Sequence, residues 1–209
     1  NTVRLVVEPA AGDGPERVLE ADALLVAAGR KPNVEGLGLE NAGVERADCE
    51  FVVIHDDDDS WLPDFLSRTV AFLEESDLYQ GVVTRSWKVD EVLEPGGVRV
   101  LDRAPYNPHL ESIYLAEMAV VNQFPPISFL FRRAVWEEVG GFDPDLPVLG
   151  DWDFNLRFLA KADIGVIPDL LANYHFRPRV AAGQGVYGNT VTHGLDQHVA
   201  YDALVRNRL

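Results

Sequence analysis

Cysteine, basic side chains and long apolar runs are all scarce in this sequence. Its 209 residues include a single cysteine, Cys49, which excludes an internal disulfide framework and fits a reducing compartment. No apolar run approaches the roughly 18 residues that a membrane span needs, and no signal-peptide pattern opens the chain. We therefore expect a cytoplasmic protein without a transmembrane segment.

The few basic residues also limit the ligands. Lysine and arginine together number 18, against 34 acidic residues, and the formal net charge is -16. Nucleic-acid binding is not expected, because a protein that follows a phosphate backbone needs a basic face. A nucleotide would have to bind through a metal ion, helix N-termini or a few local arginines. With 47% hydrophobic residues, the chain can bury the core of one domain with or without an appendage.

The stretch FVVIHDDDDSWLPDFL, residues 51–66, is the most informative part of the sequence. Residues 51–54 have high strand preference and run into four consecutive aspartates, 56–59. Ser60 is expected to cap a helix that has Pro63 in its first turn. A cap alone would need only one carboxylate, whereas a divalent cation would relieve the repulsion among four. The pattern therefore favours a metal site over a simple helix cap.

The remaining pattern predicts an α/β protein with a mixed sheet flanked by helices and an N-terminal β-hairpin segment. Strands are expected over residues 2–8, 17–20, 23–28, 81–89, 98–101, 127–131, 164–167 and 170–176. Helices are expected after Ser60, with an apolar face from Leu62 to Leu73, and over residues 109–119, 133–139, 151–161 and 195–208. The pair Gly140 and Gly141 is expected to end the helix over 133–139.

The N-terminal part contains ADALLVAAGRKPNVEGLGLENAGVE, residues 21–45, which resembles the pyridine nucleotide-disulfide oxidoreductases related to dihydrolipoamide dehydrogenase. In that family the stretch lies where the NAD-binding domain returns to the FAD domain. Residues 1–46 contain no G-x-G-x-x-G fingerprint and no redox cysteine pair. We interpret residues 1–46 as a flavoprotein-like fragment with no site of its own.

From Ala47 onward, two motifs resemble the family 2 glycosyltransferases of the GT-A fold. The first is IHDDDDSWLPDFL, residues 54–66, and the second is GGFDPDLPVLGDWDFNLR, residues 140–157. The resemblance implies an incomplete, Rossmann-like GT-A domain over residues 47–209. The family's opening strand-helix-strand unit, which binds the nucleotide base, is not found, so the chain looks like a chimera. As a hypothesis, residues 24–28 dock beside residues 51–54 as a substitute parallel strand.

The resemblance also implies roles for the acidic loop. Asp58 would bind Mn²⁺ or Mg²⁺ directly, and Asp56 would bind the metal or the ribose of the donor. Asp57 and Asp59 would support the metal ligands or the turn. His175 lies where related enzymes place a histidine that completes the metal shell or touches the diphosphate. The alternative for this histidine is a purely structural hydrogen bond at a strand end.

The second motif implies the catalytic base. Asp151 corresponds to the aspartate that takes the proton of the acceptor hydroxyl, and Arg157, expected in cofactor binding at the donor site, follows with the family's spacing of six residues. Gly150 stands where an acidic residue is common in the family, so Asp153 is a second candidate. The structural alternative for Asp151 is the N-cap of the following helix.

The sequence therefore predicts a metal-dependent inverting glycosyltransferase. It would move a sugar from a nucleotide-sugar donor to a hydroxyl of a saccharide or lipid-linked acceptor. Two alternatives remain at this point: a non-catalytic cation-binding module, and a fragment of an FAD/NAD-dependent disulfide oxidoreductase.

Overall fold

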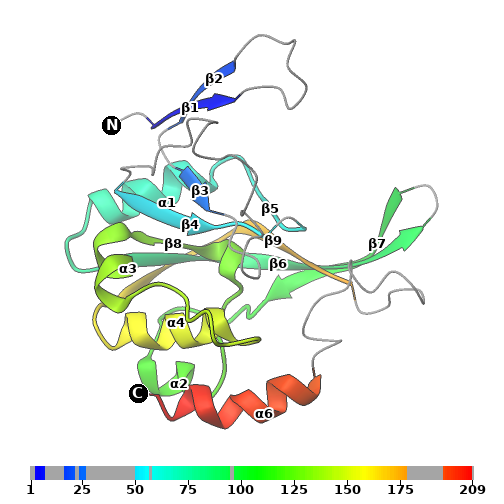
Figure 1. Cartoon of the computed structure of the whole chain (residues 1–209). Coiled ribbons are helices and arrows are strands. Elements are labelled where there is room, and N and C mark those ends of the chain that lie inside the picture. The colour runs from blue at the N-terminus through cyan, green and yellow to red at the C-terminus, as the bar shows by residue number, and fades with distance from the viewer. Residues whose placement is uncertain are drawn as a thin grey trace.

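A computed structural model describes residues 3–7, 17–21, 24–26, 50–56, 58–94, 97–177 and 195–208 (Figure 1). Several expectations lie outside these residues. They are the roles of Asp57 and Cys49 and the boundary between the two predicted segments near residue 46.

The centre of the molecule is a seven-stranded mixed sheet with the order β3-β4-β8-β6-β9-β5 and with β7 paired to β6. The β3–β4 and β6–β9 pairs are parallel, and the remaining pairs are antiparallel. The predicted class, an α/β protein with a mixed sheet flanked by helices, is confirmed. The strand bounds are β3 Leu24–Val26, β4 Phe51–Ile54, β5 Ser60–Trp61, β6 Gly81–Glu94, β7 Gly97–Tyr106, β8 Phe129–Arg132 and β9 Ile164–Phe176.

The N-terminal segment supplies a hairpin and the outer strand of this sheet. Strands β1, Val3–Val7, and β2, Arg17–Ala21, pair antiparallel as predicted. Strand β3 pairs parallel with β4 in the register Leu24 to Val52. The predicted parallel docking of this segment beside residues 51–54 is therefore confirmed over Leu24–Val26.

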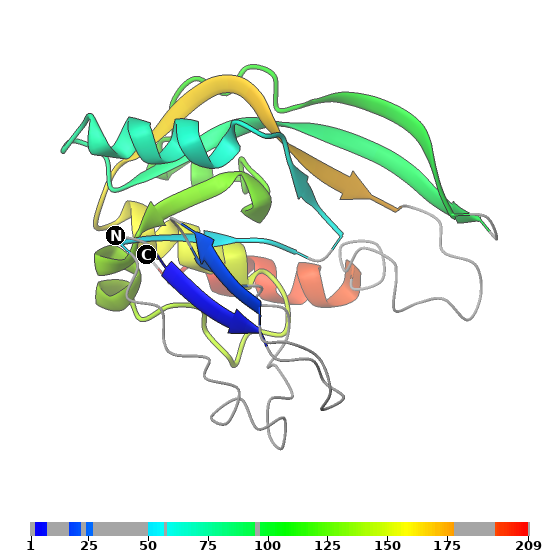
Figure 2. The ribbon, with the colours of Figure 1, turned by 90° about the horizontal axis from the view of Figure 1, so that it is seen from above.

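Helices cover both faces of the sheet (Figures 1 and 2). Helix α1, Phe65–Glu74, packs its buried face on β4 residues such as Val53, and these side chains form one apolar cluster. The next residue of β4, Ile54, belongs to the opposite cluster, because successive strand residues point to opposite faces. The helices of that second face are α2 Leu115–Met118, α3 Arg133–Val139, α4 Gly150–Leu159 and α6 Leu195–Arg206.

The helix after the acidic loop begins later than expected. Ser60 does not cap this helix. It lies in β5 and pairs with Asn173 of β9, and the N–H of Leu62 donates to the Leu171 carbonyl at 2.9 Å. Because sheet pairing holds the backbone extended there, the helix begins only at Phe65. The predicted N-cap is therefore wrong. Of the expected apolar face, Phe65, Thr69 and Leu73 are buried, whereas Leu66 is exposed and Leu62 lies before the helix.

Other boundaries also shift. The helix predicted over 109–119 is formed only at Leu115–Met118, and a 3₁₀ turn, Pro126–Ser128, precedes β8. The two strands expected after residue 164 are one strand, β9, whose pairing register with β6 shifts near Leu170. Gly140 ends α3 in the left-handed conformation, with φ of 85°, as predicted. No helix in the described parts of the chain is long and apolar enough to cross a membrane.

Candidate active site

The acidic loop connects β4 to β5 at the end of the predicted strand. It closes as a turn in which the N–H of Asp59 donates to the Asp56 carbonyl at 3.2 Å. The side chain of Asp59 points inward and is 7% exposed, and its Oδ1 accepts from the backbone N–H of His175 at 2.7 Å. Its other oxygen, Oδ2, is buried and has no hydrogen-bond partner among the described residues. Burial, followed by the charges of Asp58 and Asp56, raises the pKa of Asp59 to about 8, although the His175 hydrogen bond and Arg177 act against this shift.

A buried carboxylate that the motifs did not indicate, Glu91, connects the loop to the end of β9. Glu91 lies on β6 and is only 2% exposed. Its Oε2 lies 2.8 Å from Nδ1 of His175, and its Oε1 accepts from Nε of Arg177 at 2.8 Å. Arg177 in turn reaches Asp58, with Nη1 3.5 Å from Oδ2. One buried acid therefore orients a histidine and an arginine that both contact the acidic loop.

His175 is consequently held on both sides of its ring. Because a carboxylate only accepts, the proton on Nδ1 is directed at Glu91, which leaves Nε2 as the acceptor. Nε2 lies 3.2 Å from Oγ of Ser60, and Ser60 also accepts from Nδ2 of Asn173 at 3.1 Å. The structure thus places the predicted histidine beside the acidic loop, in an oriented tautomer.

Asp151 lies in the first turn of α4. The N-cap of this helix is Leu149, so the alternative that Asp151 is the N-cap is wrong. Oδ2 of Asp151 accepts from Nδ2 of Asn122 at 2.8 Å, and Oδ1 of Asn122 accepts from Asn155 at 3.2 Å. Burial raises the pKa of the Asp151 carboxyl, and hydrogen bonds from the backbone and from Asn122 partly offset this effect.

Two other residues of the second motif have internal partners. Arg157 donates through Nε to Asp153 at 2.8 Å, through Nη1 to the Val139 carbonyl at 2.6 Å and through Nη2 to the Gly141 carbonyl at 2.7 Å. Asp153 is 1% exposed and also pairs with Arg208 at 3.2 Å. Two nitrogens of Arg157 therefore fasten α4 to the end of α3 and the turn after it, the third pairs within α4, and its predicted place at the donor gains no support from these contacts.

Two tyrosines, Tyr106 of β7 and Tyr174 of β9, pack against each other. Their rings meet edge to face, with centroids 5.8 Å apart. Burial and then the charge of Asp151 raise the pKa of Tyr106. Burial raises the pKa of Tyr174, and the charges of Tyr106, Asp59, Asp151 and Asp58 raise it further. Burial is therefore the main cause of both shifts.

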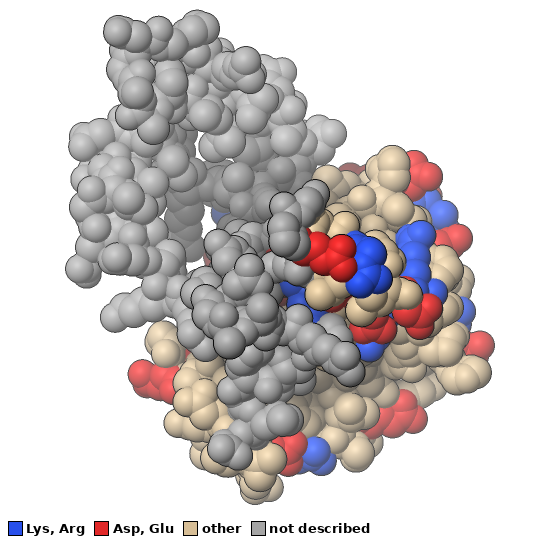
Figure 3. Space-filling view, turned by 90° about the vertical axis from the view of Figure 1, so that its right-hand side faces the viewer, with Lys and Arg blue, Asp and Glu red and all other residues tan. Residues whose placement is uncertain are grey.

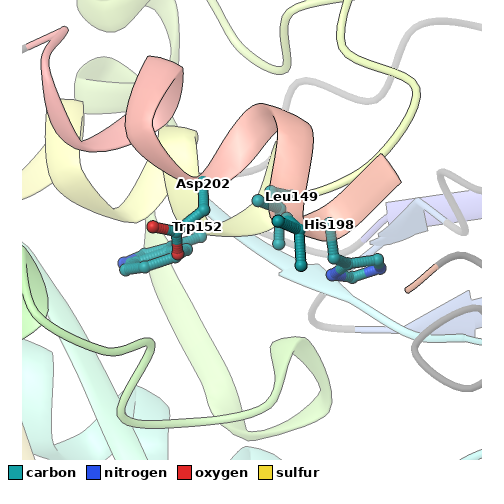
Figure 4. Close-up of a pocket in the computed structure, with 5 residues that line it drawn as sticks. Leu149, Trp152, His198 and Asp202 are labelled. Carbon is teal, nitrogen blue, oxygen red and sulfur yellow. The ribbon is translucent and has the colours of Figure 1, made fainter. Parts of the chain in front are cut away.

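A hollow of about 340 Å³ lies between the start of α4 and helix α6 (Figure 4). Leu149 and Trp152 come from the α4 side, and His198 and Asp202 project from α6. The indole of Trp152 donates to the Met118 carbonyl at 2.7 Å, so its orientation is fixed. Both apolar and polar side chains therefore line the hollow.

The surface seen in Figure 3 mixes charges of both signs. Acidic and basic side chains lie close together over the described part of this face. The described part of the view shows no continuous basic surface.

Comparison with known proteins gives two kinds of match. The family model "Glycosyl transferase family 2" matches residues 37–138, which begin before the predicted boundary at residue 47. The "Uncharacterized glycosyltransferase YwdF" of Bacillus subtilis is 26% identical over 165 residues, which are 78% of this chain and 58% of that protein. A solved structure of S. aureus TarS 1-349 in complex with UDP-GlcNAc is 17% identical, with a TM-score of 0.49, and covers 76% of this chain and 44% of that chain.

The second kind of match is short. Dihydrolipoyl dehydrogenase 1, mitochondrial, of Arabidopsis thaliana is 48% identical over 54 residues, which are 26% of this chain and 10% of that protein. This chain therefore spans only part of every relative named, from a tenth of the dehydrogenase to somewhat more than half of YwdF.

Proposed function

Because the family model "Glycosyl transferase family 2" matches residues 37–138, we propose that this chain belongs to that family and transfers a sugar from a nucleotide-sugar donor to a hydroxyl of a saccharide or lipid-linked acceptor. The transfer would invert the configuration at the sugar carbon, because a single base activates the acceptor. The observation that carries the proposal is the match of the family model to residues 37–138, and we assign the donor to the acidic loop and the acceptor to Asp151. Donor and acceptor would meet between these two acidic groups.

Asp56 and Asp58 would hold a divalent cation, Mn²⁺ or Mg²⁺. The described residues contain no group of three His, Cys, Asp or Glu side chains arranged as an all-protein metal site. Two carboxylates nevertheless suit Mg²⁺, which is commonly bound by one or two carboxylates together with substrate phosphates. When bound, the cation would supply positive charge for the diphosphate leaving group. His175, with Nδ1 directed at Glu91, has the tautomer that a ligand nitrogen at Nε2 requires.

Asp151 would act as the general base. Asn122 holds one of its oxygens, so the carboxylate keeps a fixed orientation toward the acceptor hydroxyl. Its raised pKa makes it a stronger base than an exposed aspartate.

The test separates donor binding from chemistry. We would measure the binding of a panel of nucleotide sugars, UDP-GlcNAc among them, by calorimetry with and without Mn²⁺, and then measure transfer to acceptor. Asp58→Asn should abolish the Mn²⁺-dependent part of donor binding. Asp151→Asn should leave donor binding within about twofold and lower turnover by roughly 10²-fold or more. If no nucleotide sugar binds to the wild-type chain, the proposal is wrong.

A further inference from the structure

We infer that Arg177 supplies a second positive charge at the donor site. Its side chain competes with the metal ion for Asp58 and binds the diphosphate once the metal is bound. The buried Glu91 is its positioning residue. The inference rests on the proposed function and adds a residue that neither sequence motif contains.

The first step is the way in which Glu91 fixes the guanidinium group. Oε1 of Glu91 lies 2.8 Å from Nε and 2.7 Å from Nη2 of Arg177, and the Glu91 side chain is 2% exposed. Both distances are those of strong charge-assisted hydrogen bonds. Two of the three guanidinium nitrogens are therefore anchored on one edge. The planar fork then dictates where the third nitrogen points, and lysine could not reproduce this geometry.

The second step is the contrast at the third nitrogen. Nη1 of Arg177 lies 3.5 Å from Oδ2 of Asp58, clearly longer than the contacts to Glu91. An ion pair at this separation is loose compared with the 2.7–2.9 Å of a good one. The Arg177 side chain is 14% exposed and that of Asp58 is 26% exposed, so neither is fully removed from solvent. Of the contacts that Arg177 makes with Glu91 and Asp58, the one with Asp58 is therefore the easier for an incoming ligand to replace.

The third step is the consequence for charge. Asp58 is the carboxylate that the proposed function assigns to the metal, and the guanidinium already provides positive charge beside it. A divalent cation must then share Asp58 with Arg177 and is repelled by it. Once the cation is bound, the same arginine lies beside the metal with an edge of its fork directed away from Glu91. A diphosphate offers acceptor oxygens for that edge.

The inference predicts that one substitution changes the affinities for Mn²⁺ and for UDP in opposite directions. Arg177→Gln keeps a donor for Glu91 but removes the charge. In the full chain without nucleotide, the Arg177→Gln variant should bind Mn²⁺ roughly three- to tenfold more tightly than wild type, as measured by electron paramagnetic resonance. With saturating Mn²⁺, it should bind UDP roughly tenfold more weakly. An arginine with a purely structural role would move both affinities in the same direction or neither.

Glu91→Gln supplies the test of positioning. Without its anchoring charge, Arg177 should move closer to Asp58, so Mn²⁺ binding should weaken by roughly three- to tenfold, the opposite of Arg177→Gln. The exposed pair Arg68 and Asp169, 2.7 Å apart, provides matched charge controls. Arg68→Gln and Asp169→Asn should leave Mn²⁺ affinity within about twofold, because exposed distant charges are screened. Thermal melts confirm that each variant is folded, and Arg177→Lys, which retains the charge, replaces Arg177→Gln if the latter does not fold.

The outcomes separate this inference from the proposed function. Unchanged or weaker Mn²⁺ binding by Arg177→Gln overturns the competition, even where nucleotide sugars bind. If Arg177→Lys has to be used instead, the inference requires that this variant binds UDP more weakly than wild type and binds Mn²⁺ with the wild-type affinity. Tighter Mn²⁺ binding by Arg177→Gln supports the competition, even where no nucleotide sugar binds and the transferase proposal fails.

Discussion

The buried carboxyl of Asp59 makes the stability of the fold depend on pH. This carboxyl has a pKa of about 8 in the folded protein, raised from 3.8, mainly because burial disfavours the charge. The folded state therefore prefers the protonated acid. The stability that this group contributes is complete below pH 4 and is lost as the pH rises through 8.

Asp59→Asn should remove that dependence. The amide oxygen can still accept from the His175 N–H, but the side chain cannot ionise. In melts monitored by circular dichroism in EDTA, the Tm of the variant relative to wild type should rise between pH 5 and pH 9. The exposed Asp64, replaced by Asn, is the control. A Tm difference that stays constant over this range would show that Asp59 ionises freely in the folded protein.

Asn122 should set the acid limb of the proposed reaction. Its hydrogen bond to Asp151 lowers the pKa of that carboxyl, so Asn122→Ala should raise the pKa further. A general base must be ionised, and the acid limb of kcat against pH should therefore move to higher pH. We expect a loss of roughly tenfold in kcat near neutral pH, with little change in donor binding. An unshifted limb would argue against Asp151 as the base.

At the scale of single residues, the sequence indicated candidate site residues that stand in local motifs. It did not indicate the residues that contact them. Two short sequence motifs indicated Asp56, Asp58 and Asp151. Glu91 and Arg177 meet the acidic loop only because β6 and β9 pair. Glu91 did leave one signal: it shares the inward side of β6 with Val89, where an apolar residue is expected.

Single elements show how closely the sheet and helices pack. A Cβ added to Gly81, at the start of β6, would lie 2.6 Å from the ring of Phe129 and 3.1 Å from that of Phe158. Both rings are fully buried and cannot swing away. Gly81→Ala should therefore lower the free energy of unfolding by about 1–3 kcal/mol.

Chemical denaturation followed by tryptophan fluorescence would measure this loss. Gly150→Ala is the matched control, because nothing lies within 4 Å of an added Cβ there. It should leave the free energy of unfolding unchanged or slightly raised, since alanine favours helix over glycine. Equal stability of the two variants would mean that the core at β6 adapts to an extra methyl group.

The elements also show where sequence patterns succeed. The helix over 133–139 was predicted with its stop at Gly140, because helix periodicity and a left-handed glycine are both local signals. The helix start at Ser60 was predicted wrongly because Ser60 pairs with a strand more than 100 residues away. Pro105 lies inside β7, paired with Trp87. Because β7 pairs only with β6 among the described strands, a proline is tolerated there.

For the whole molecule, the unusual feature is a sheet whose outer strand comes from a segment that resembles another family. The pairing of β3 with β4 covers a strand in which Phe51, Val53 and Ile54 are buried. Without β3, one edge of β4 would present unpaired N–H and C=O groups beside an apolar surface. Such edges pair with other chains and cause aggregation.

Two truncations test this role of the N-terminal segment. A chain of residues 24–209 retains β3 and should remain monomeric, with a Tm close to that of the full chain. A chain of residues 47–209 lacks β3 and should melt at a lower temperature and associate, as seen by light scattering over a range of concentrations. Leu25→Pro in the full chain should act in the same direction, because proline removes a backbone donor from the strand paired at Val53. If residues 47–209 stay monomeric with an unchanged Tm, β3 is dispensable, and the glycosyltransferase-like region closes its own sheet edge.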